Sequence, residues 1–353
     1  MTPFAAQIDP RAHARAGHGA PTLVPTPLEE RRRPVPIADD GTDRVRAAAW
    51  TVAVHEDITA LLTDLDGGGA FVEEQWARDG GGGGVSRLMM EGMTFEKAGV
   101  NRSMVHGVLP PEALQRLGVA AVPGEVRFFA SGVSVVVHPR SPRIPTVHLN
   151  VRFFELSDED GHTLDRWFGG GTDLTPMYPQ PEDAASFHRA LADVCAPFGR
   201  ALHPRFKAWC DDYFVNRHRT QERRGVGGIF YDHLRPHEFG PDRRSLHALA
   251  VAVGTSLRTT YAPIVEARRD AAWGDDERAL QLERRGRYVE FNLLHDRGTL
   301  FGLQTSARTD SVLMSLPPQA SWPRPGGHPA GSLGDRLTAM LAPRDWLAVD
   351  AVA

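Results

Sequence analysis

Polar side chains recur at every second position of one β-rich segment, and their types could do chemistry together. Residues 132–138 and 146–154 are rich in β-branched residues, which predicts two strands, and the three prolines between them cannot continue a sheet. We expect the two strands to pair as a hairpin in an even register, which gathers their polar side chains on one face. Those side chains are Ser134, His138, His148, Asn150 and Arg152.

This face would carry a hydroxyl, two imidazoles, an amide and a guanidinium, whereas a solvated outer face more usually carries Lys, Glu and Thr. The pattern favours a functional site over an ordinary polar surface. Arg152, Arg297 and Arg308 each follow an apolar strand-like run or lie on its adjoining turn. Because guanidinium pairs bidentately with carboxylate, converging arginines would suit a polycarboxylate ligand. Surface arginines are also common, so the spacing alone supports a polycarboxylate site and an ordinary charged surface equally.

Four histidines raise the possibility of a metal site, since imidazole is the commonest transition-metal ligand. They are His138, His148, His188 and His218. Their spacings match no compact motif such as H-E-x-x-H, and a single histidine is more often packed or hydrogen-bonded than a ligand. An imidazole beside an arginine could instead donate or accept a proton near neutral pH.

Several familiar sites have no counterpart in the sequence. It contains no G-x-G-x-x-G between a strand and a helix, no C-x-x-C-H and no G-x-S-x-G. The glycine run at 79–84 is interpreted as a flexible hairpin tip. The run at 169–171, followed by Asp173, either lets a backbone pass close to a large ligand or marks a tight crossing between strands.

Length and composition describe a globular chain. The chain has 353 residues, a hydrophobic fraction of 41% and a net charge of −4, so no global basic field favours nucleic acid. No apolar run is long enough to span a membrane. The two cysteines, Cys195 and Cys210, are expected to be buried thiols of a reducing compartment, which favours a cytoplasmic protein. Residues 1–43 are expected to be a disordered extension, and residues 44–353 a single domain.

Strands that are joined locally, with helices between the blocks of strands, predict an α+β fold, with a large, mainly antiparallel sheet flanked by helices on both sides. The expected helices are 43–66, 182–197, 203–224, 245–267, 275–285 and 332–341. Residues 286–318 are expected to form an antiparallel meander of three strands, with Asp296, Arg297 and Gly298 at a tight turn.

Several long blocks of this sequence closely resemble the oxygen-dependent coproporphyrinogen III oxidase family, and they occur in the family's order. They are FEKAGVNRSMVHG, ASGVSVVVHPRSPRIPTVHLNVRFFE, WFGGGTDLTPMYP, HRTQERRGVGGIFYDHL and GRYVEFNLLHDRGTLFGLQTSARTDSVLMSLPP. The resemblance covers the chain from about Val45 to its C-terminus, and blocks of this length are far more specific than any single motif.

The resemblance implies an aerobic oxidative decarboxylation in haem biosynthesis. The ring A and B propionates of coproporphyrinogen III would become vinyl groups, which gives protoporphyrinogen IX. It also implies a homodimer, with residues from Tyr288 onward in the dimer contacts. Oxygen would be the co-substrate and no organic cofactor would be needed, while a divalent metal, manganese or iron, differs among family members.

The resemblance also implies roles for individual residues of this chain. His148 would be a proton donor, and Asp296 and Arg297 would orient the tetrapyrrole. The implied substrate contacts are Ser134, Asn150, Val151, Arg152, Ser306, Ala307 and Arg308. The last three stand where the family usually has Gly-Gly-Arg, so a close approach that needs glycine would be affected. The implied metal ligands are His138, His148, His188 and His218.

Two other functions fit parts of the pattern. One is a metal-dependent oxygenase that acts on another polycarboxylate, with the four histidines as iron or manganese ligands. The other is a carrier that binds a tetrapyrrole without turning it over. Metal analysis and activity under a strong chelator separate the first from the family reaction, and a turnover assay separates the second.

Overall fold

In the computed structural model, the described part of the chain is organised around a seven-stranded antiparallel sheet in the order β1-β2-β3-β4-β5-β6-β9. The structure describes residues 42–110, 113–114, 124–304, 308–323 and 327–349. The expected disordered extension therefore lies outside the described residues, except for Thr42 and Asp43, which cap and begin helix α1. The strands of this sheet are β1 (Val72–Ala77), β2 (Gly82–Met90), β3 (Phe95–Val108), β4 (Arg127–Pro139), β5 (Thr146–Ser157), β6 (Thr163–Thr175) and β9 (Gly227–Leu234).

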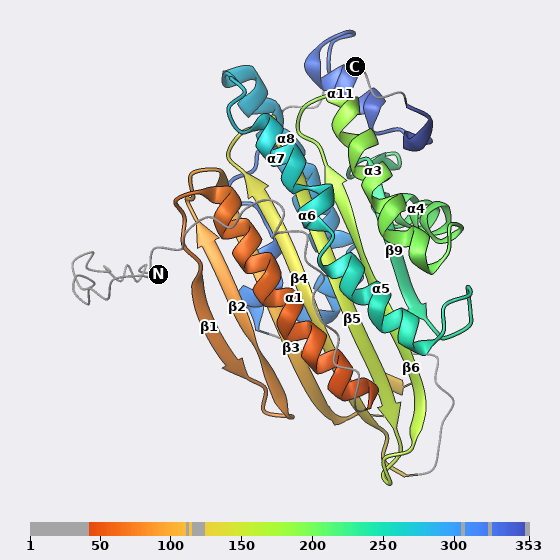
Figure 1. The fold of residues 1–353 in the computed structure, drawn as a ribbon. Coiled ribbons are helices and arrows are strands. Elements are labelled where there is room, and N and C mark those ends of the chain that lie inside the picture. Colours follow the sequence, from red (N-terminus) through yellow and green to blue (C-terminus); the bar gives the residue numbers. More distant parts are fainter. Residues whose placement is uncertain (1–41, 111–112, 115–123, 305–307, 324–326, 350–353) are drawn as a thin grey trace, which may run out of the picture.

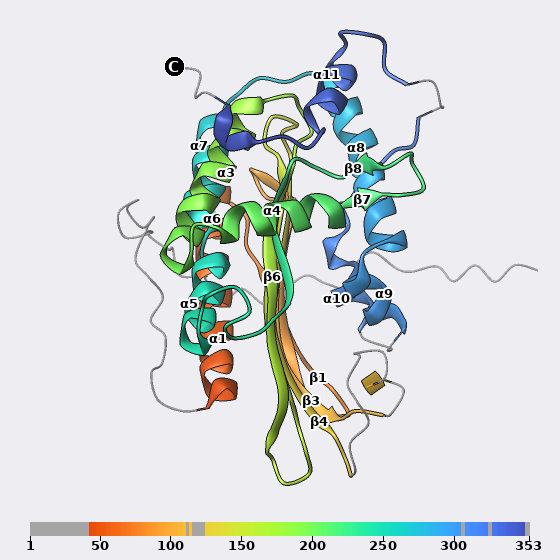
Figure 2. The same ribbon diagram turned by 90° about the vertical axis from the view of Figure 1, so that its right-hand side faces the viewer.

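Helices cover both faces of the sheet, which confirms the predicted α+β class (Figure 1). One layer contains α1 (Asp43–Asp66), α3 (Pro181–Cys195), α5 (Arg243–Gly254), α6 (Leu257–Thr260) and α7 (Ala262–Arg268). Figure 2 shows the opposite layer, which contains α8 (Asp275–Leu294), α9 (Arg297–Gln304) and α10 (Thr309–Val312). The remaining elements are α4 (Leu202–Tyr213), α11 (Leu333–Met340), β7 (Val215–Asn216), β8 (Glu222–Arg223), η2 (Ala196–Phe198), η3 (Leu313–Ser315) and η4 (Trp346–Ala348).

The main core lies between the sheet and α1, and it follows from the alternation of the strand sequences. The apolar side chains at odd positions of β4 and β5 are fully buried and pack with Trp50, Val54 and Ile58 of α1. These strand residues are Val133, Val135, Val137, Val147, Leu149, Val151 and Phe153. Because neighbouring side chains of a strand point to opposite faces, the even positions are left for the other side of the sheet.

The predicted hairpin is confirmed in its register. On β4 and β5, Ser134 pairs with Asn150, Gly132 with Arg152 and Val136 with His148. Pro139 ends β4, and Pro142 and Pro145 lie in the connection between the strands, where no ladder hydrogen bonds are needed. The polar side chains of the two strands therefore share one face, opposite the core.

The predicted meander over residues 286–318 is wrong. Helix α8 continues to Leu294, and α9 and α10 follow it. The buried side chains Leu280, Arg284, Tyr288 and Phe291 are three or four residues apart, which is the spacing of one helix face. The expected turn is instead a helix start: the Asp296 carboxylate accepts a hydrogen bond from the Thr299 N–H at 2.7 Å, as a helix cap does.

Two long predicted helices are interrupted. The helix expected over 203–224 ends at Tyr213 and gives way to the short strands β7 and β8, so His218 lies in the turn between them. The helix expected over 245–267 is divided into α5, α6 and α7, and Pro263 lies in the first turn of α7, where a proline is tolerated.

Cys195 and Cys210 are both buried free thiols, as expected. Among the residues that the structure describes, no helix has the length and apolar character needed to cross a membrane.

Candidate active site

A directional hydrogen-bond chain runs along the polar face of β5. Arg152 donates from Nη1 to the Asn150 side-chain oxygen at 2.9 Å, and Asn150 Nδ2 lies 3.3 Å from His148 Nε2. On its other side, His148 Nδ1 lies 2.8 Å from Asp173 Oδ1. The carboxylate fixes the proton on Nδ1, so Nε2 is the acceptor for Asn150 when the ring is neutral. The three polar residues of β5 thus form one network.

Asp173 belongs to β6, where it stands directly opposite His148. Its second oxygen forms an ion pair of 2.5 Å with Arg224, and the side chains of both residues are 2% exposed. The Arg224 guanidinium also lies over the rings of Phe214, Tyr288 and Phe291. Burial raises the pKa of Asp173, but the Arg224 charge and the His148 hydrogen bond outweigh it, so the pKa lies below the ordinary value. Asp173 is therefore an anion behind the imidazole.

A second carboxylate, Asp232 of β9, links two of the predicted arginines. Arg152 Nη2 lies 2.8 Å from Asp232 Oδ1, and Arg297 Nη2 lies 3.6 Å from Asp232 Oδ2. Burial raises the pKa of Asp232, but the charge of Arg152 and its hydrogen bond outweigh burial, so the pKa lies below the ordinary value. Arg152 and Arg297, which are 145 positions apart in the sequence, therefore meet at one anion.

Asp296 and Arg297 are held by Tyr213, which is the last residue of α4. The Tyr213 hydroxyl donates to Asp296 Oδ1 at 3.0 Å and accepts from the Arg297 N–H at 3.1 Å. The Arg297 guanidinium lies 5.0 Å from the centre of the Tyr213 ring. Burial, with the Asp296 charge, raises the pKa of Tyr213 to about 12, so the phenol keeps its proton near neutral pH.

The glycine run of β6 makes room for Arg152. A Cβ atom at Gly169 would lie 2.5 Å from Arg152 Nε and 2.7 Å from its Cζ. Gly169 stands opposite Arg152 in the β5–β6 ladder, so any larger side chain there would displace the guanidinium. The run therefore serves the close approach of a side chain between strands.

The other predicted substrate contacts have different positions. Ser134 is exposed on the polar face beside Asn150, while the side chain of Val151 is buried in the core on the opposite face. Ser306 and Ala307 lie outside the described residues. Arg308 pairs with Glu74 of β1 at 2.5 Å. Neighbouring strands are about 4.8 Å apart, so Glu74 lies roughly 19 Å from β5. The structure thus does not bring Arg308 to Arg152.

The four predicted metal ligands do not form one ligand set in the described chain. His138 is fully buried and bonds the Ser315 carbonyl oxygen at 2.9 Å. His188 is also fully buried and bonds the Val226 carbonyl oxygen at 3.1 Å. His218 contacts His295 and Glu290, at 2.8 and 3.0 Å. Because His148 contacts Asp173 and Asn150 and the other three histidines have different partners, this arrangement does not fit one shared metal ion.

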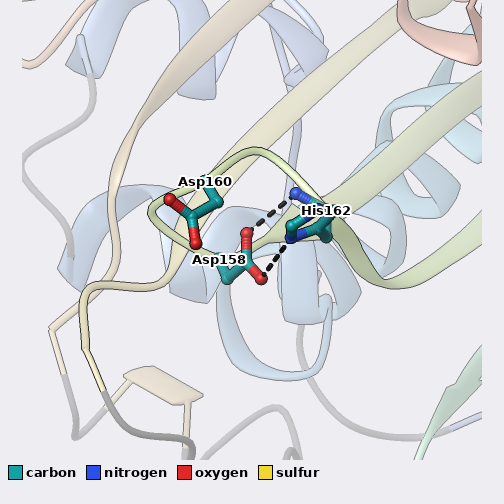
Figure 3. A group of neighbouring side chains, drawn as sticks. All are labelled: Asp158, Asp160 and His162. Atoms are coloured by element: carbon teal, nitrogen blue, oxygen red, sulfur yellow. Dashed lines mark hydrogen bonds and ion pairs between the residues drawn. The ribbon is translucent and has the colours of Figure 1, made fainter.

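Among the described residues, one group of three possible ligands does approach within 4.8 Å. It consists of Asp158, Asp160 and His162 at the β5–β6 turn, and Figure 3 shows His162 bonded to Asp158. Asp160 and His162 are exposed, and exposed acidic turns are common without a metal. The group lies at the far end of the hairpin from His148.

Three residues of the site were not identified from the sequence: Tyr213, Arg224 and Asp232. Of these, only Asp232 could have been placed from a sequence pattern. Gly228, Phe230 and Asp232 are alternate residues of β9 and share one face. Gly228 pairs with Asp173, so this is the face of Asp173. Tyr213 and Arg224 lie in α4 and after β8, where no periodicity distinguishes them.

An imidazole–carboxylate pair and two arginines that meet at one anion lie together on one side of the antiparallel sheet. Such a cluster of ionisable groups is typical of enzyme active sites. The family model described as coproporphyrinogen III oxidase matches residues 46–346. The chain therefore belongs to the coproporphyrinogen III oxidase family, which confirms the resemblance of the sequence blocks. The match supports a coproporphyrinogen oxidase in haem biosynthesis, an oxidative decarboxylase.

Proposed function

We propose that this protein is an oxygen-dependent coproporphyrinogen III oxidase that converts the ring A and B propionates of its substrate to vinyl groups and releases protoporphyrinogen IX. In each conversion, the propionic acid side chain and one O₂ give a vinyl group, CO₂ and H₂O₂. The bond to the carboxyl carbon breaks, and its electron pair forms the new double bond. A hydrogen on the carbon next to the ring leaves with its electron pair and reduces O₂, together with one proton.

The observation that carries the proposal is the network of His148, Asn150 and Arg152 on one strand face, with Arg297 brought to Arg152 by Asp232. Guanidinium groups suit the carboxylate of a propionate, and fix which arm is presented. In its protonated form His148 carries a proton on Nε2 as well as on Nδ1, and with the anionic Asp173 behind it, it can deliver the proton that peroxide formation consumes.

Asp296 is proposed to orient the macrocycle through its pyrrole N–H groups. One of its oxygens already accepts from Tyr213 and the other from Thr299. A carboxylate oxygen has two lone pairs, so each can still accept a second hydrogen bond. The same residue caps α9, so its catalytic and structural contributions must be separated by the choice of variant.

We also propose that the protein is a cytoplasmic homodimer, as the family resemblance implies. Leu293, Leu294 and Leu303, on α8 and α9, are exposed apolar side chains within the region from Tyr288 onward. Light scattering of the purified chain is expected to give twice 38.7 kDa. A mass of one chain at micromolar concentration would contradict the dimer.

The reaction is tested by an aerobic turnover assay. Freshly reduced coproporphyrinogen III is supplied to chelator-treated protein, and protoporphyrin fluorescence is followed after oxidation of the product. Product under air and not under nitrogen supports the proposal without a metal. Activity that is lost with chelator and restored by manganese or iron would instead favour a metal-dependent oxygenase. Substrate binding without product under any condition would favour a carrier.

A further inference from the structure

Asp232 is the one carboxylate, in the described part of the chain, that contacts both Arg152 and Arg297. Arg152 comes from β5 and Arg297 from the start of α9, in different layers of the fold. The arginine side chains are 38% and 60% exposed, whereas that of Asp232 is 13% exposed. Two partly exposed cations therefore meet at one mostly buried anion.

The position of Asp232 is set by an irregularity of β9. Gly170 pairs with Tyr231 and Phe168 pairs with Leu234, so β9 has two residues, Asp232 and His233, opposite Gly169 alone. Such a bulge redirects a side chain and is frequent next to active sites. The bulge places Asp232 next to Gly169, which lies opposite Arg152 in the β5–β6 ladder.

His233 keeps the bulge in place. Its φ angle is +50°, in the left-handed region that residues other than glycine seldom adopt. Its ring stacks on Trp167 with the centroids 4.8 Å apart and the planes at 15°. Its N–H also donates to Asp232 Oδ1 at 2.9 Å. An unfavourable backbone angle held by packing next to a functional group is typical of a preorganised site.

From this geometry we propose that Asp232 is a positioning residue that fixes Arg152 and Arg297 so that together they bind one carboxylate of the substrate. This inference rests on the proposed function and extends it. The three side chains carry a net charge of +1, which matches one carboxylate. Without the anion, the two guanidinium groups would repel each other and move apart, because both have room in solvent.

The test is the variant Asp232→Asn, which keeps the size of the side chain and removes its charge. We expect KM for coproporphyrinogen III to rise by about tenfold to a hundredfold, with a smaller change in kcat, because misaligned guanidinium groups lose charge-assisted hydrogen bonds to the bound carboxylate. The Kd of coproporphyrin III, a stable oxidised tetracarboxylate with the same arms, should rise in parallel. Asp232→Glu, which keeps the charge, should recover part of the affinity.

The matched control is Asp57→Asn. Asp57 of α1 pairs with Arg258 of α6 at 2.6 Å, in the helical layer on the other side of the sheet, and its side chain is 12% exposed, close to the 13% of Asp232. This variant should leave KM and Kd unchanged. In a double-mutant cycle, Asp232→Asn should have a much smaller effect in an Arg152→Ala background, because Asp232 acts through that arginine.

The inference is overturned if Asp232→Asn leaves KM unchanged or lowers it while the wild type is active. A lower KM would mean that the Asp232 carboxylate competes with the substrate carboxylate for the two arginines. Additive effects in the cycle would also overturn it. If the wild type is inactive under every condition, the proposed function fails. The Kd series with coproporphyrin III then decides by itself whether Asp232 organises a carboxylate site.

Discussion

Removing the charge of Asp173 should destabilise the protein far more than removing the charge of an exposed ion pair. Asp173 and Arg224 are each 2% exposed and pair at 2.5 Å. Loss of one partner leaves a buried, uncompensated charge, which costs about 3–5 kcal/mol. Asparagine can still accept one hydrogen bond, so we expect the lower end of that range for Asp173→Asn. At about 2.1 cal/mol/K of unfolding entropy per residue, a loss of about 3 kcal/mol lowers the Tm of a chain of 353 residues by roughly 4–5 °C.

The assay is urea unfolding followed by circular dichroism, with thermal unfolding as a second measurement. Asp165→Asn is the matched control, because the Asp165–Arg235 pair is 25% and 43% exposed and such pairs contribute about 0–1 kcal/mol. In the double variant Asp173→Asn/Arg224→Met, most of the lost stability should return, since no buried charge remains. The reasoning is refuted if Asp173→Asn and Asp165→Asn lower the free energy of unfolding equally.

Three other outcomes are expected. Asp296→Asn should lose most turnover with its Tm unchanged, because asparagine caps a helix as well as aspartate does. Asp296→Ala should lose about 1 kcal/mol of stability in addition. A near-normal kcat in Asp296→Asn would exclude a role for the charge. Arg152→Ala should raise KM by about tenfold to a hundredfold, from the loss of about 1.5–3 kcal/mol of charge-assisted hydrogen bonding, and unchanged steady-state constants would count against it. Burial lowers the pKa of His55 to about 4, so the unfolded chain binds the extra proton first as the pH falls. The free energy of unfolding should therefore fall between pH 6.5 and 4. The slope from this residue is up to about 1.4 kcal/mol per pH unit. His55→Gln should flatten the profile in that window, and an identical slope would show that His55 does not contribute.

The central hairpin could be predicted because its information is local. β-Branched residues alternate with polar ones, and prolines stop both strands. An even register then puts Ser134, Asn150 and Arg152 on one face, since a slip by one residue would bury polar groups in the core. The sheet class, the helix at Asp43–Asp66 and the closing helix α11 were determined in the same way.

The helix that starts at Asp275 was predicted, but the region after Arg285 could not be assigned from its local pattern. Short apolar runs broken by glycine and aspartate fit a strand or a helix equally well. The choice was made by burial: Arg284 and Tyr288 are buried on one side of α8, which only a helical spacing achieves. Asp296 consequently caps a helix instead of standing at a hairpin tip.

The sequence by itself determined the family, the antiparallel sheet and the strand that carries His148, Asn150 and Arg152. Only the tertiary structure decided that Asp173 and Arg224 stand behind the imidazole, that Asp232 joins Arg152 to Arg297, and that the four histidines stay apart. The physical reason is that periodicity records which face of an element is buried. Contacts between side chains from different elements depend on how those elements pack, on a bulge in β9 and on the glycine at position 169, and no local pattern encodes those distances.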